Sequence, residues 1–241
     1  MLIKLKKERQ KLLLKFLFST AISLAFVIAI GLTDWIVTTK MSIMLLILLG
    51  LIIYIWPIRP KMFFYHQQIA YLMMKESQIS QRQVKLSFLS QSFVRKLEKM
   101  TFKLTQDYGE FLLYYRLTKD RKEFKYNRGT LEICILIKNE FTPFADDEIV
   151  KAINQLEDNL KKQKKRFKDY VILQFRENET ITNELIHETD QVVFDKQLKR
   201  HITKINVLQL KDLSVYYLAS DKFSPTLHYA YALDLIKQIL I

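Results

Sequence analysis

Two apolar segments near the start of the sequence constrain the fold more than any other feature. The first runs from about Leu12 to Leu32, and the second runs from about Met41 to Ile58. A helix of about 18 to 20 residues spans roughly 27–30 Å, which is the thickness of the hydrocarbon core of a bilayer. A buried core helix is rarely apolar on all sides twice in succession, so we expect a transmembrane helical hairpin over residues 12–58.

Basic residues on both flanks predict the orientation of this hairpin. Residues 1–61 hold nine basic and two acidic side chains, a net charge of +7, whereas the whole chain of 241 residues carries +13. Because positive charge favours the cytoplasmic side, we predict a two-pass protein of the cell membrane with both termini in the cytoplasm. Membrane lipid is then one expected partner. The basic and aromatic side chains expected near the membrane interfaces are Lys4, Lys6, Lys7, Arg9, Lys11, Lys15, Trp35, Tyr54, Trp56, Arg59 and Lys61.

A cleaved signal peptide is the alternative interpretation of the first apolar segment. Its lysine-rich start and the small residues Ala29 and Gly31 resemble such a leader. The apolar stretch is long for that role, however, and cleavage would place a lysine-rich domain outside the cell. The single cysteine, Cys134, excludes an intramolecular disulfide and fits a reducing compartment.

The sequence predicts one soluble domain beyond the hairpin. Residues 1–11 are expected to be a basic cytoplasmic N-terminus, residues 59–83 a juxtamembrane helix with a polar linker, and residues 84–241 a cytosolic α/β domain. Helices and strands follow one another along this domain, so a mixed sheet with flanking helices, in the mixed α+β class, is the expected fold.

Local patterns predict the elements of this domain. A helix capped by Ser90 should precede a hairpin, and the run 131–138 should form a central strand, because it is apolar on both faces. A second helix should begin with Thr142 as its cap and carry an apolar stripe from Ile149 to Phe167. The later elements are expected as a strand over 169–175, a short helix around 179–188, strands near 191–194, 203–209 and 213–219, and a last helix from Ser224 to the C-terminus.

The order of the first six elements, αβββαβ, resembles the core order of restriction-endonuclease-like nucleases. Their chemistry needs an acid on the second strand, and an acid and a lysine two residues apart on the third, to hold a metal ion and activate water. Here Glu132 is followed by Cys134 at the lysine position, so the motif is broken. Glu132 is instead expected to anchor a strand end or to pair with a basic neighbour. The weak catalytic candidates are Glu98, Glu110 and Glu132.

No other catalytic or cofactor motif stands out in the sequence. The four glycines are too scattered for a phosphate-binding loop, and Cys134 lies in an apolar run, where we expect a core residue. The histidines show no metal-ligand spacing along the chain; they are His66, His187, His201 and His228. We therefore expect no metal and no cofactor, and the sequence leans against an enzyme.

The run KKQKKRFK over residues 161–168 is the densest basic segment of the domain. Its simplest interpretation is a solvated helix end, and contact with anionic lipid or a partner is the alternative. No aromatic stacking platform is interleaved with it, which disfavours nucleic acid. The residues of this candidate patch are Lys161, Lys162, Lys164, Lys165, Arg166 and Lys168.

Three functions remain open on this sequence. The first is a non-catalytic accessory or scaffold subunit that binds a protein partner, or another copy of itself, at the inner membrane face. An alternative is a membrane-tethered sensor or effector, for example of the defence or immunity type, that acts through its hairpin. The second alternative is a nuclease-like enzyme, either active or degenerate.

Overall fold

The computed structural model divides the chain into two compact units, Met1–Glu76 and Ser77–Ile241. The structure describes residues 1–77, 82–118, 129–197 and 200–241. Most of the expected linker at the end of 59–83 therefore lies outside the described residues.

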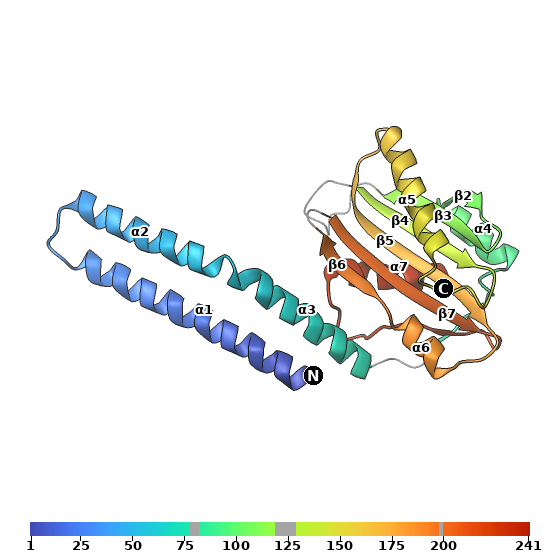
Figure 1. Ribbon diagram of the computed structural model, residues 1–241, viewed down its shortest axis with the longest axis horizontal. Coiled ribbons are helices and arrows are strands. Elements are labelled where there is room, and N and C mark those ends of the chain that lie inside the picture. Colours follow the sequence, from blue (N-terminus) through green and yellow to red (C-terminus); the bar gives the residue numbers. More distant parts are fainter. Residues whose placement is uncertain (78–81, 119–128, 198–199) are drawn as a thin grey trace. The chain divides into compact units, whose positions relative to one another are not determined.

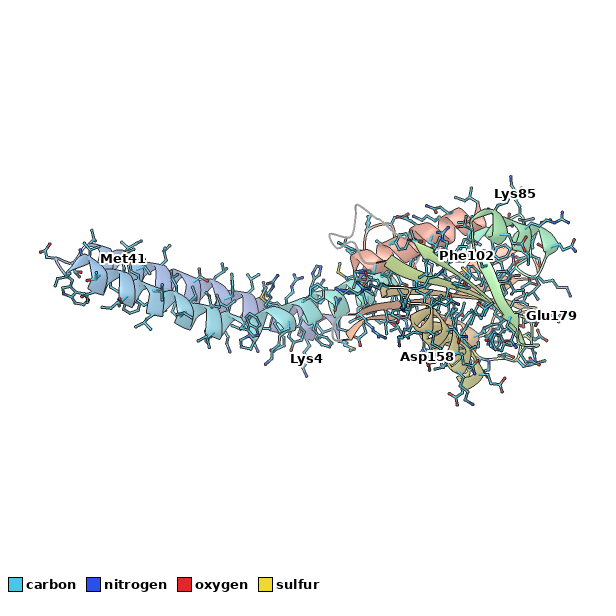
Figure 2. All side chains as sticks on the ribbon, turned by 90° about the horizontal axis from the view of Figure 1, so that it is seen from above. Lys4, Met41, Lys85, Phe102, Asp158 and Glu179 are labelled. Carbon is cyan, nitrogen blue, oxygen red and sulfur yellow. The ribbon has the colours of Figure 1, made fainter. Side chains whose placement is uncertain are left out.

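The first unit consists of α1 (Leu2–Gly31), α2 (Val37–Ile55) and α3 (Ile58–Glu76). The helix α1 runs antiparallel to the arm formed by α2 and α3 (Figure 1), and Figure 2 shows Lys4 and Met41 near opposite ends of this hairpin. Each arm contains a helix that is long and apolar enough to cross a membrane.

Both helical arms extend beyond the expected spans. With 30 residues, α1 rises about 45 Å, so the basic residues 1–11 are almost all part of the same helix as the first span. The helix expected after the second apolar segment is α3, and it packs along α1. Pro60 falls in the first turn of α3. Proline is tolerated there because main-chain N–H groups in the first turn have no acceptor within the helix, so the N–H that proline lacks is not needed. The hairpin is therefore longer than the apolar segments alone indicate.

The second unit is a mixed sheet with flanking helices, as the sequence predicts. The strands lie in the order β1-β8-β7-β5-β4-β3-β2, and β6 also pairs with β7. The strands β4, β5 and β7 are parallel to one another, whereas the other pairs are antiparallel. The elements are β1 (Arg82–Gln83), α4 (Gln91–Lys99), β2 (Lys103–Asp107), β3 (Phe111–Thr118), β4 (Gly129–Ile137), α5 (Asp147–Lys162), β5 (Phe167–Asn178), α6 (Asn183–Thr189), β6 (Val193–Gln197), β7 (Arg200–Leu210), β8 (Ser214–Tyr216) and α7 (Leu227–Leu240).

Helices cover both faces of the central strands, which explains why these strands are apolar throughout. On one face α5 packs Leu156 into a cluster with Ile133 of β4. On the other face α4 packs Phe93 against Phe175 of β5, with 5.7 Å between the ring centroids, and α7 lies behind the sheet in Figure 1. Cys134 is fully buried in β4, which confirms its predicted place in the core, and burial raises the pKa of its thiol well above the usual value.

Two helix starts follow cap chemistry. The predicted cap of α4 is confirmed, because Ser90 Oγ accepts a hydrogen bond from the main-chain N–H of Phe93 at 3.2 Å. The last helix starts at Leu227, three residues later than expected from Ser224. Its cap is Thr226, whose Oγ1 accepts a hydrogen bond from the main-chain N–H of Tyr229 at 3.0 Å.

The predicted start of α5 at Thr142 is wrong. The cap is Asp146, whose Oδ1 accepts a hydrogen bond from the main-chain N–H of Glu148 at 2.7 Å. Thr142 is instead held by tertiary contacts: its Oγ1 donates to Glu110 Oε2 at 3.2 Å, and its carbonyl oxygen accepts from Arg176 at 2.7 Å. These contacts keep the segment before Asp146 out of helical geometry.

The predicted stripe of this helix also extends too far. Phe167 is the first residue of β5, because α5 already ends at Lys162. Lys164 adopts the left-handed conformation, with φ of 57°, and the N–H of Lys165 donates to the carbonyl oxygen of Leu160 at 3.0 Å. This is the hydrogen-bond pattern of a left-handed helix stop, here without glycine.

Candidate functional site

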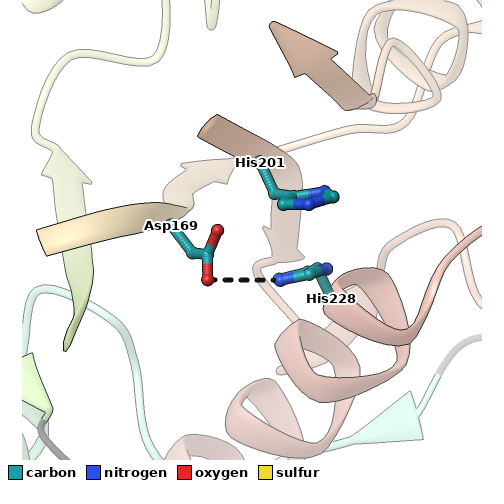
Figure 3. Close-up of side chains that lie close together, drawn as sticks. All are labelled: Asp169, His201 and His228. Atoms are coloured by element: carbon teal, nitrogen blue, oxygen red, sulfur yellow. Dashed lines mark ion pairs between the residues drawn. The ribbon is translucent and has the colours of Figure 1, made fainter. Parts of the chain in front are cut away.

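Asp169, His201 and His228 lie close together near the starting ends of two central strands, although they come from three separate elements (Figure 3). Asp169 and His201 are Cα partners in the parallel pairing of β5 with β7, close to the start of both strands. His228 lies in the first turn of α7. One possible ligand atom from each side chain lies within 4.8 Å of the other two.

The two imidazole rings stack beside the carboxylate. The ring centroids of His201 and His228 are 4.2 Å apart, and the ring planes differ by 10°. The Nε2 atom of His228 lies 3.5 Å from Asp169 Oδ2, which is long for a charge-assisted hydrogen bond. Asp169 is only 7% exposed, and its Oδ1 accepts no hydrogen bond from any residue that the structure describes.

The electrostatics of this cluster favour an ionised carboxylate. Burial by itself raises the pKa of the Asp169 carboxyl group, but His228, through its side chain, and His201, through its ring and its main-chain N–H, lower the pKa below its ordinary value. The cluster therefore places a carboxylate beside two imidazole rings, which are groups that can coordinate a cation.

Glu132 forms a second buried cluster. We call this cluster closed, because both oxygens of its carboxylate accept hydrogen bonds from residues of the chain. Its Oε2 accepts a hydrogen bond from Arg116 Nε, and its Oε1 accepts from Thr118 Oγ1 at 2.8 Å and from the Tyr231 hydroxyl. Arg116 also donates to the carbonyl oxygen of Met100 at 2.7 Å. Burial by itself lowers the pKa of the Arg116 guanidinium, but the Glu132 carboxylate raises it above its usual value. Glu132 thus pairs with a basic neighbour, as expected, and is 0% exposed.

The other two candidate acids lie elsewhere. Glu98 is exposed on α4, and Glu110 is exposed in the turn before β3. Phe111, which follows Glu110, and Arg116, the Cα partner of Glu132, are five residues apart along β3, or roughly 16 Å. The structure therefore does not bring the three acids together into one nuclease-like site.

A polar cleft of about 470 Å³ opens at the opposite end of the central strands from Asp169. It lies where the three parallel strands β4, β5 and β7 end, the edge at which open α/β sheets commonly bind ligands. Phe141 lines this cleft, and 83% of its surface is exposed. The residues lining the cleft are Leu89, Lys138, Asn139, Glu140, Phe141, Glu177, Asn178, Glu179, Leu210 and Lys211.

The basic run is a solvent-exposed end of α5. Lys161 and Lys162 form its last turn, and Lys161 Nζ lies 2.6 Å from Glu157 Oε1. Lys164, Lys165 and Arg166 are exposed in the connection that follows, and Lys168 is partly buried on β5.

The candidate membrane-interface residues all lie in the first unit. They are exposed, apart from Arg9, which is partly buried. Arg9 and Arg59 both line an apolar groove of about 480 Å³ whose walls come from α1, the end of α2 and the start of α3. The cations that flank the two apolar segments therefore lie at the same end of the hairpin. The other residues lining this groove are Leu13, Phe16, Ile55, Ile58, Met62, Phe63 and His66.

Comparisons with protein-family models, curated proteins and solved structures give no match to this chain. The restriction-endonuclease-like relationship therefore stays a prediction from element order.

The cluster of Asp169, His201 and His228 is not predicted by the spacing of histidines along the chain. It depends on the parallel register of β5 with β7 and on the docking of α7. The one hint in the sequence was an aspartate at the head of the apolar run 169–175.

Proposed function

We propose that this protein is a membrane-anchored accessory subunit. Its hairpin holds the second unit at the cytoplasmic face of the cell membrane, and that unit binds a protein partner without catalysing a reaction. The observation that carries the proposal is the exposed ring of Phe141 at the polar cleft.

An exposed aromatic ring is the kind of side chain that anchors protein interfaces. In the second unit, Phe141 is the only aromatic residue among the large apolar side chains that the structure describes as exposed. Its backbone is fixed, because its main-chain N–H donates to Asn139 Oδ1 at 3.0 Å. Leu89, 39% exposed, adds apolar surface in the same cleft.

Four of the five charged residues that line this cleft, all except Glu140, already make polar contacts within the chain. Lys138 Nζ lies 2.6 Å from Asp107, and Lys211 Nζ lies 3.1 Å from Glu179. Glu177 accepts a hydrogen bond from the main-chain N–H of Leu89 at 3.0 Å. Such a rim does not favour a strongly charged small ligand. It suits a protein surface, because interfaces combine an apolar centre with a polar rim.

The hairpin supports the membrane half of the proposal. Each arm is long and apolar enough to cross a bilayer, and Arg9 and Arg59 line an apolar groove at the basic end. A basic pocket beside apolar helix surface suits an anionic phospholipid of the cytoplasmic leaflet. In this orientation both flanks of the hairpin face the cytoplasm.

Affinity purification of the full-length protein from its native membrane in mild detergent tests the binding proposal. We expect a stoichiometric protein partner with the wild type and at least a tenfold loss of that partner with Phe141→Ala, since interface anchors contribute about 2 kcal/mol or more. Leu227→Ala is the matched control, because Leu227 is 75% exposed on α7 and lies outside the cleft. A wild type that emerges without a partner contradicts the proposal.

Labelling of introduced cysteines tests the orientation. Cys134 is fully buried and does not interfere in the folded protein. In intact cells a membrane-impermeant maleimide should label Thr38→Cys but not Lys4→Cys. Thr38 lies in the first turn of α2, next to the connection between the two arms of the hairpin. The reverse pattern contradicts a cytoplasmic domain.

A further inference from the structure

We propose that Asp169, His201 and His228 form a binding site for a divalent transition-metal ion of the zinc type. One carboxylate oxygen and one nitrogen from each imidazole would be the ligands. This site lies at the opposite end of the parallel strands from the Phe141 cleft. The proposal does not depend on the protein partner proposed for that cleft.

The donor chemistry favours this class of ion. Imidazole nitrogen together with carboxylate oxygen suits zinc and its first-row neighbours, whereas magnesium and calcium prefer oxygen ligands alone. Two histidines and one carboxylate recur in protein sites of zinc and of iron(II). Cys134 lies outside this set of ligand atoms, so no thiolate takes part.

The state of Asp169 is the observation that points to a ligand. The residue is 7% exposed, yet its Oδ1 accepts no hydrogen bond from the described residues. A buried carboxyl group with an unused oxygen is unfavourable unless a cation or a donor reaches it. A bound metal ion would supply that missing partner.

A neighbouring cation of the chain does not fill this role. Arg200, the residue before His201, directs its guanidinium to Glu157 Oε1 at 2.7 Å and to the Tyr170 hydroxyl at 3.2 Å. The positive charge nearest to His201 in the sequence is therefore committed to another carboxylate.

The geometry requires only small side-chain movements. Zinc bonds of about 2.0–2.1 Å in a tetrahedron place the ligand atoms about 3.3 Å apart, and here they lie within 4.8 Å of one another. Asp169 and His201 are fixed by the paired strands β5 and β7, and His228 is fixed by the capped first turn of α7. Three protein ligands leave a fourth position for water or an exogenous ligand.

Cobalt(II) titration of the full-length protein in mild detergent tests the proposal. The protein carries an affinity tag without histidine and is first stripped with a chelator and dialysed. We expect one equivalent of Co²⁺ to bind with the visible absorption of a four-coordinate N/O site, with no thiolate charge-transfer band, and Zn²⁺ to displace it.

Matched histidine variants assign the site. His201→Asn and His228→Asn should each weaken Co²⁺ binding by at least about tenfold, the lower end of the loss known for supporting residues of metal sites. His187→Asn, the same change at an exposed histidine of α6, should bind as the wild type does. Far-ultraviolet circular dichroism and the protection of Cys134 from thiol reagents show that each variant is folded.

Two results would overturn the proposal. The first is a wild-type protein that binds no Co²⁺ or Zn²⁺ after chelation. The second is binding that is equally strong in folded His201→Asn and His228→Asn, or that is lost equally in His187→Asn.

Discussion

Glu132 and Asp169 are buried carboxylates on the neighbouring parallel strands β4 and β5, and each meets one side chain of α7. Tyr231 donates to Glu132, whereas His228, one turn earlier in the helix, lies 3.5 Å from Asp169. Both oxygens of Glu132 accept hydrogen bonds, and its charge is opposed by Arg116. Asp169 lies beside the imidazole rings of His201 and His228, and its Oδ1 accepts no hydrogen bond from the described residues.

This difference shows that burial of a carboxylate does not by itself mark a functional site. What separates the two clusters is how completely the carboxylate oxygens are bonded within the chain. A fully bonded carboxylate such as Glu132 ties β3, β4 and α7 together, and removing it leaves other groups unsatisfied. A carboxylate with an unused oxygen, such as Asp169, is poised for a ligand from outside the chain.

The largest expected effect comes from breaking the closed cluster. Glu132→Ala leaves the partly buried Arg116 charge and the buried Tyr231 hydroxyl without the carboxylate that both contact, so the free energy of unfolding should fall by about 3–5 kcal/mol. The measurement is a urea titration of the full-length protein in detergent, followed by pulse labelling of the Cys134 thiol. Cys134 is the single cysteine, is 0% exposed and lies in β4, so its labelling reports on the sheet.

The control for this variant is Glu98→Ala, which removes an exposed carboxylate and should change the free energy of unfolding by less than about 0.5 kcal/mol. Tryptophan fluorescence is not a substitute, because Trp35 and Trp56 both lie in the first unit. Similar losses in Glu132→Ala and Glu98→Ala would contradict the view that the Glu132 cluster stabilises the sheet.

Two substitutions one turn apart on α7 sharpen the comparison. Tyr231→Phe removes a hydrogen bond to a charged group and should lower the free energy of unfolding by about 1.5–3 kcal/mol. In metal-free protein His228→Asn should lower it by about 1 kcal/mol or less, because the contact of His228 Nε2 with Asp169 Oδ2 is long, at 3.5 Å. The same Cys134 labelling measures both, and a larger loss for His228→Asn would reverse our assignment of the two clusters.

The contrast also shows how far the sequence could lead. The cap at Ser90, the central strand around Cys134 and the pairing of Glu132 with a basic neighbour follow from local patterns or from the alternation of side chains on a strand. The predicted start of α5 is wrong because tertiary hydrogen bonds to Thr142 override the local preference of this residue for a cap position. The Asp169 cluster could not be predicted, since nothing local states that β5 and β7 pair in parallel.

A smaller effect is expected at the cap of α7. Thr226→Ala removes the hydrogen bond that Thr226 Oγ1 accepts from the N–H of Tyr229, which should lower the free energy of unfolding by about 1 kcal/mol. Because α7 carries both His228 and Tyr231, this loss should be seen with and without added Zn²⁺. Thr226→Ser retains the acceptor and is the control; an equal loss in both variants would show that the cap does not stabilise α7.

The smallest effect is expected at Glu157, a carboxylate whose cationic partners are exposed. Burial by itself raises the pKa of Glu157, but Lys161 and Arg200 help to lower it below 4.5. A carboxyl group whose pKa falls on folding adds stability above its unfolded pKa and loses it as the pH falls through the folded value. Glu157→Gln should therefore lower the free energy of unfolding by less than about 1 kcal/mol at about pH 7, and by less still at about pH 3. Urea titrations at both pH values measure this, and a difference that grows in acid would contradict the direction of the pKa shift.

The most direct test of the contrast between the two carboxylates is the effect of Zn²⁺ on the urea midpoint of Cys134 labelling, in the wild type and in Asp169→Asn. At a free concentration 100 times its dissociation constant, one ion bound only by the folded state adds about 2.7 kcal/mol to the free energy of unfolding. Any binding of Zn²⁺ to the exposed Cys134 thiol in the unfolded chain is the same in both proteins. We predict a raised midpoint in the wild type and an unchanged midpoint in Asp169→Asn, whereas equal midpoint shifts in the two proteins, or none in either, would contradict an open site at Asp169.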